Sequence, residues 1–118
     1  MVVIGNKSQV TPRKFENAPV VQGVEKRVLI GAADRAPLFV MRHFTVAPGG
    51  YTPEHAHAWE HEVYVLAGRG RAHGQGGAQD VGPGDFIFVP PMDVHQFRNT
   101  GDVPLEFICV VPLAGDVE

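Results

Sequence analysis

The chain lacks several features that mark common protein classes. It contains a single cysteine, Cys109, so no disulfide can form within the chain, and we expect a cytoplasmic location. No apolar run approaches the roughly 20 residues that cross a membrane, and the first residues lack the pattern of a secretory signal. Ten basic residues against 13 acidic ones, without a basic cluster, argue against nucleic acid or an anionic membrane surface as a partner.

The sequence is instead rich in residues that punctuate strands. Fourteen glycines and ten prolines separate short β-branched and aromatic runs, and no amphipathic pattern is long enough for a three-turn helix. The expected strands are Lys26–Ile30, Leu38–Val46, His61–Leu66, Gly70–His73, Asp85–Val89, His95–Arg98 and Leu105–Val111, with turns at 47–50 and 74–77 among others. This pattern predicts one antiparallel all-β sandwich or barrel over residues 1–118, with residues 1–23 as an N-terminal arm that could pair with a partner subunit.

Four of the six histidines lie in two short segments bounded by glycine and proline: His55, His57, His61 and His95. Alternate residues of a strand face the same side, so His55 and His57 would present both rings to one point, and His61 has the same parity. Neutral imidazole is the commonest side-chain ligand for a divalent transition metal. We interpret the four as a metal site; the alternative is that they are unrelated core or surface residues.

The spacing of these residues resembles the two motifs of the cupin family. In the first motif, over residues 49–70, Gly49 is followed after five residues by His55-Ala56-His57, then by His61 and, six residues on, by Gly68. In the second motif, over residues 84–99, Gly84 is followed by Pro90, His95 and Asn99. Met92 stands where the family usually has glycine, and His61 where it usually has glutamate.

This resemblance implies a cupin double-stranded β-helix, a jelly-roll barrel that forms a homodimer. The chain further resembles small single-domain cupins with four-histidine manganese sites, which cleave styrene-type alkenes when given a hydroperoxide. The resemblance therefore implies a metal-dependent oxygenase that acts on a small apolar or aromatic substrate, with one manganese ion per chain. Imidazole alone suits Mn, Fe, Ni, Cu and Zn alike. Two other functions stay open: a non-catalytic small-molecule-binding cupin, and a non-redox isomerase or lyase.

The fourth ligand of the implied site is either His61 or Glu62, because the family allows three or four residues after the His-x-His pair. The six residues between His61 and Gly68 match the family spacing, whereas Glu62 has five. His61 also shares strand parity with His55 and His57, while Glu62 should face the other side. We therefore predict His61 as the ligand.

Parity also predicts the lining of the site. Phe97 should share the inward face of His95, and Phe107 and Cys109 should alternate inward along the last strand; the alternative is that they are ordinary core. Cys109 is either open to oxidation or an inert buried residue. Arg42 would be a buried cation that either anchors an anionic substrate or forms a structural ion pair. Trp59 would cap the cavity or pack a loop.

His43 and His73 lie outside both motifs, and we expect each at the surface or an interface rather than at the metal.

Replacing His61 by alanine should lower metal occupancy more than replacing Glu62 by alanine, because only His61 is predicted to face the site. Elemental analysis of the purified variants measures this directly. The reverse order would show that Glu62 is the ligand.

Overall fold

The computed structural model describes residues 1–116. Within them the chain forms one sheet of nine strands, with the order β6-β5-β8-β3-β9-β4-β7 and with β2 paired to β3 and β1 to β2. Every pairing between these strands is antiparallel. The strands are β1 Arg13–Asn17, β2 Val21–Ile30, β3 Phe39–Tyr51, β4 His61–Ala67, β5 Gly70–Gly74, β6 Gly77–Val81, β7 Phe86–Val89, β8 Gln96–Asn99 and β9 Leu105–Pro112.

No α-helix occurs in residues 1–116; short 3₁₀ turns at Lys7–Gln9, Ala32–Asp34 and Leu113–Gly115 are the helical elements there. The absence of a helical pattern from the sequence is thus confirmed, together with the all-β class. No helix in this part of the chain is long and apolar enough to cross a membrane.

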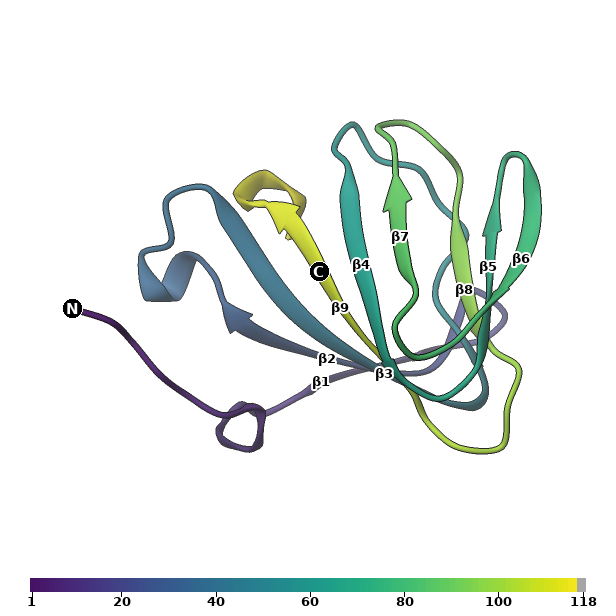
Figure 1. Cartoon of the computed structure of the whole chain (residues 1–118), viewed down its shortest axis with the longest axis horizontal. Helices are drawn as coiled ribbons and strands as arrows, with labels where there is room; N and C mark the ends of the chain where they lie inside the picture. The colour runs from purple at the N-terminus through teal and green to yellow at the C-terminus, as the bar shows by residue number, and fades with distance from the viewer. Residues whose placement is uncertain (117–118) are drawn as a thin grey trace.

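The longest strand, β3, pairs with three other strands, and the sheet curls around it. Strand β3 pairs with β2 along one edge and with β9 along the other, and it reaches β8 at Tyr51. In Figure 1, strands β4, β7, β8, β5 and β6 gather on one side of the molecule, while β1, β2, β3 and β9 cross the other. Between the β5–β6 hairpin and β7 lies a cleft of about 390 Å³, and its lining includes His95.

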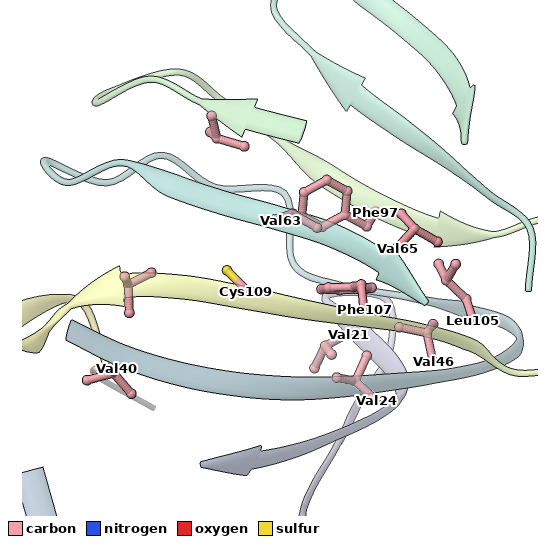
Figure 2. Packing of buried hydrophobic residues seen from close by; sticks show 12 residues of the cluster. Val21, Val24, Val40, Val46, Val63, Val65, Phe97, Leu105, Phe107 and Cys109 are labelled. Carbon is pink, nitrogen blue, oxygen red and sulfur yellow. The ribbon is translucent and has the colours of Figure 1, made fainter. Parts of the chain in front are cut away.

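The interior is filled by the inward residues of alternating strands. On β9, Leu105, Phe107, Cys109 and Val111 are buried and their neighbours are partly exposed, as the period of two requires. Figure 2 shows Phe107 and Cys109 on one side of the core, with Val63 and Phe97 facing them. The predicted inward face of the last strand is therefore confirmed.

One expected turn differs from the structure, and another is confirmed. Residues 47–50 do not end a strand but form a bulge within β3, where pairing passes from Val24↔Val46 to Gln22↔Tyr51 and Gly49 has φ of +77°. The expected turn at 74–77 is confirmed, because Gly74 pairs with Gly77; the turn joins β5 to β6, a largely exposed strand that was not among the expected ones.

The N-terminal arm is shorter than the predicted residues 1–23. Arg13–Asn17 pairs with β2, and β2 itself begins at Val21. The remaining residues carry a 3₁₀ turn at Lys7–Gln9, and Met1 to Ile4 are fully exposed. Figure 1 shows the N-terminus extending away from the sheet.

The glycine that ends the first motif is required by close backbone packing. Gly68 has φ of +83°, and a Cβ atom there would overlap the carbonyl oxygen of Pro104 and lie 2.8 Å from Cα of Leu105. A side chain at this position would therefore push β9 away from the end of β4.

Candidate metal centre

Two backbone hydrogen bonds join the two histidine segments. The N–H of His55 donates to the carbonyl of His95 over 3.2 Å, and the N–H of His95 donates to the carbonyl of His55 over 2.9 Å. Within residues 52–60, this isolated bridge at His55 is the one β pairing, and no strand forms. The prediction that His55 and His57 occupy a strand is therefore wrong. The segment is bounded by Pro53 and lacks a partner strand, and its rings converge because the loop is fixed at this bridge.

The rings of His55, His57 and His95 form a group that could hold a metal ion. One ligand atom from each lies within 4.8 Å of the others, and the Nε2 atoms of His55 and His57 are 3.2 Å apart. Two nitrogens bound at 2.0–2.1 Å to one ion are about 3 Å apart when they occupy adjacent positions. The spacing of this pair therefore fits a shared ion.

His61, at the start of β4, lies beside this group but is not one of the three residues whose ligand atoms all lie within 4.8 Å of one another. Its ring centroid is 4.8 Å from that of His95 and 5.2 Å from that of His57. The residue is only 6% exposed, and its Nε2 atom is buried with no hydrogen-bond partner among residues 1–116. Glu62 is exposed on the opposite face, beside Phe88 and Val110. The predicted orientations of His61 and Glu62 are both confirmed.

Backbone groups orient two of the rings. Nδ1 of His95 lies 2.9 Å from the carbonyl oxygen of Asp93, so in the neutral ring Nδ1–H donates and Nε2 keeps its lone pair. The N–H of Met92 donates to the carbonyl of His57. Met92 has φ of +69°, a left-handed conformation that favours glycine, which explains the usual residue at this position of the motif. No side-chain pattern signals the role of the Asp93 carbonyl, so the sequence could not reveal it.

The surroundings keep the imidazoles neutral. Burial lowers the pKa of His55 to about 4, with smaller effects from His57, His95 and Arg42. Burial likewise lowers the pKa of His61 to about 3, and neighbouring rings and Arg42 add to this. The pKa values of His57 and His95 are also lowered, mainly by burial. Because metal ligation needs the unprotonated ring, these histidines are in the protonation state that a ligand requires at neutral pH.

Aromatic side chains surround the histidine group. The Phe97 ring centroid is 6.0 Å from that of His95 and 5.3 Å from that of Phe107. The Trp59 ring stacks on His57 with centroids 4.7 Å apart and planes 7° apart, and it also packs against Gly115. Phe97 and Phe107 thus provide apolar surface next to the site, and Trp59 covers the outer side of His57.

Arg42 and Cys109 place polar groups in the same interior. Arg42 is 6% exposed, and its Nη2 donates to Sγ of Cys109 over 3.0 Å. Nη1 of Arg42 forms an ion pair with Oδ1 of Asp116 over 3.7 Å. Nε of Arg42 has no hydrogen-bond partner among residues 1–116. Arg42 therefore forms an ion pair, which was one of the two alternatives that the sequence left open. The pair leaves Nε without a hydrogen-bond partner among residues 1–116.

His43 lies outside the metal-binding group, as expected, but it is not at the surface, because its side chain is buried. His43 lies on the outer face of β3, where Nε2 is 3.0 Å from Oε1 of Glu106, and Nζ of Lys7 binds the same oxygen over 3.0 Å. The N-terminal segment therefore covers His43. His73 lies in the lining of the cleft and is partly exposed.

The chain is similar to several known proteins. An oxalate-binding protein from Thermotoga maritima is 30% identical over 116 residues, and the alignment covers 94% of each chain. A 1-methylthio-D-xylulose 5-phosphate methylsulfurylase from Rhodospirillum rubrum is 38% identical over 71 residues, 60% of this chain and 46% of that protein. The chain thus spans less than half of that relative.

Among solved structures, the polyketide cyclase RemF from Streptomyces resistomycificus aligns with a TM-score of 0.87 and 35% identity, over 96% of this chain and 80% of that chain. The family described as a cupin domain matches residues 42–111, more than half of the chain, and this range includes both histidine segments. The chain therefore belongs to the cupin family.

Proposed function

We propose that this cupin is a metal-dependent enzyme in which His55, His57, His61 and His95 hold one divalent ion. The observation that carries the proposal is the convergence of three ring nitrogens within 4.8 Å, next to the buried and unpartnered Nε2 of His61. Four neutral ligands leave the charge of the ion uncompensated, and a six-coordinate ion would keep positions open for a substrate. The resemblance favours manganese, and Fe, Cu, Ni and Zn are the alternatives.

The reaction that we favour is oxygen transfer to a small apolar or aromatic alkene. A redox-active ion, when bound, supplies the activation of dioxygen or a hydroperoxide needed to cleave a carbon–carbon double bond oxidatively. Each carbonyl product takes one oxygen atom: one dioxygen molecule supplies both atoms, whereas two hydroperoxide molecules are needed, each giving one oxygen atom and leaving as its alcohol. Phe97 and Phe107 would hold the alkene against apolar surface and keep water away. Among residues 1–116, no Asp, Glu or Tyr side chain is buried, so none offers a sheltered acid or base for a proton-transfer reaction.

A second candidate is a non-redox reaction of an anionic or enolisable substrate, with the ion as Lewis acid. The observation that favours it is Arg42, a buried cation whose charge acts on His55, His57 and His61 and whose Nε lacks a partner within residues 1–116. The similarity of the chain to a cyclase and to a methylsulfurylase also favours a reaction of an anionic or enolisable substrate. Similarity to an oxalate-binding protein supports a third outcome, binding without turnover.

Loading the protein with Mn²⁺, Fe²⁺ or Zn²⁺ separates these functions. We expect consumption of tert-butyl hydroperoxide with styrene as probe for the Mn²⁺ or Fe²⁺ protein, none for the Zn²⁺ protein, and loss of activity in His95→Ala but not in Glu62→Ala. Turnover of an enolisable diketone by the Zn²⁺ protein would instead support the Lewis acid. Tight oxalate binding without turnover under any metal would contradict an enzyme.

We also propose that the protein is a homodimer. The outer face of β4, β7, β9 and β3 exposes apolar side chains, with Phe86 at 84% and Phe88 at 56%. Register places Phe86 beside Tyr64, and Glu62 between Phe88 and Val110. The segment 7–10 covers the neighbouring part of this face. Lys7 Nζ donates to Oε1 of Glu106, and Arg27 Nε donates to the carbonyl of Val10. The exposed apolar residues Met1 to Ile4 continue beyond that cover, so a second copy would give both surfaces a partner.

Sedimentation equilibrium at micromolar concentration should give a particle of two chains. Phe86→Lys together with Phe88→Lys should dissociate it, because the two charges would be buried at the interface, whereas Val103→Lys on a distant exposed turn should not. A monomeric wild-type protein at tens of micromolar would contradict the homodimer.

A further inference from the structure

The thiol of Cys109 lies between a proposed metal ligand and a buried cation. Its Sγ atom is 3.3 Å from Nδ1 of His61 and 3.0 Å from Nη2 of Arg42. The strand register produces this contact, because Arg42 on β3, Cys109 on β9 and Val63 on β4 form one inward row. His61 precedes Val63 by two residues and points to the same interior.

A neutral imidazole carries a single proton, and the surroundings of His61 limit where that proton can lie. On Nε2, the N–H would be a buried donor, and no acceptor for it exists among residues 1–116. On Nδ1, the N–H can donate to Sγ of Cys109, and Nε2 keeps its lone pair, on a ring whose centroid is 4.8 Å from that of His95. Only this second tautomer makes Nε2 a ligand.

The sulfur of Cys109 can act as the acceptor because it meets a donor on each side, Arg42 Nη2 and His61 Nδ1. Arg42 donates to the same Sγ and cannot accept, so the guanidinium holds the thiol as an acceptor. The S–H group is a weak donor, so it competes little for Nδ1 and loses little when it has no acceptor.

We propose that Cys109, held by Arg42, is a positioning residue of the metal centre: it accepts the Nδ1 proton of His61 and so presents Nε2 to the ion. The inference rests on the proposed function, because His61 must be a ligand for its tautomer to matter. It gives Cys109 a role that neither plain core packing nor oxidation describes, and it assigns Arg42 a task in the site even without substrate.

Zinc binding to the reduced full-length protein tests this role with a readout independent of activity. Cys109→Ala should weaken Zn²⁺ affinity about 10- to 100-fold in a chelator competition, because outer contacts of metal-bound histidines have effects of this size. Cys109→Ser keeps an acceptor and should recover most of the affinity. Val65→Ala removes a larger volume from the same core, at a position paired with Phe107, and it should lower stability but leave affinity within about twofold.

Long-range proton–nitrogen NMR of the zinc-loaded protein reports the tautomer itself. We expect the His61 proton on Nδ1 in the wild type and in Cys109→Ser. A wild type with that proton on Nε2, or a Cys109→Ala variant that binds Zn²⁺ as tightly as the wild type, would overturn the positioning role while leaving the four-histidine site intact. A wild type that does not bind Zn²⁺, Mn²⁺ or Fe²⁺ would overturn the proposed function and this inference together.

Discussion

The reciprocal hydrogen bonds between His55 and His95 are the contact on which the site depends. They join a segment that otherwise lacks regular pairing to the residue that precedes β8, and so bring the two motifs together. Neighbouring contacts extend this junction: the N–H of Phe97 donates to the Thr52 hydroxyl over 2.9 Å, and the Thr52 N–H donates to the Phe97 carbonyl over 2.9 Å. These bonds, of which one uses the Thr52 hydroxyl, therefore fix the backbone segments that carry His55 and His95.

The junction lies in an interior that disfavours positive charge on the rings. Apolar walls remove water, and Arg42 adds a fixed cation whose field acts on His55, His57 and His61. Protonating any of these rings would place like charges close together, so each remains neutral and keeps a lone pair. Neutral rings whose nitrogens converge can bind a divalent ion directly, so the convergence of His55, His57 and His95 makes this a candidate metal centre.

The fold and the inward residues followed from the sequence because strand periodicity records burial directly. Phe107 and Cys109 alternate on β9, and His61 and Glu62 take opposite faces of β4, as their parity predicts. The bulge at Gly49 and the buried His43 were not predictable in this way, because both depend on contacts distant in sequence. The contact of Cys109 with both Arg42 and His61 is of the same kind, since it exists only when three strands are in register. The strand Gly77–Val81 pairs locally with β5, but most of its residues are exposed and so it shows no alternation of burial.

X-ray absorption of the zinc-loaded protein at the zinc edge tests the central claim, that imidazoles alone supply the protein ligands of one ion. The account predicts nitrogen and oxygen neighbours, multiple scattering from four imidazole rings and no sulfur, because the Cys109 thiol faces Nδ1 of His61 and Arg42. A sulfur neighbour, or scattering from fewer than three imidazoles, would contradict it.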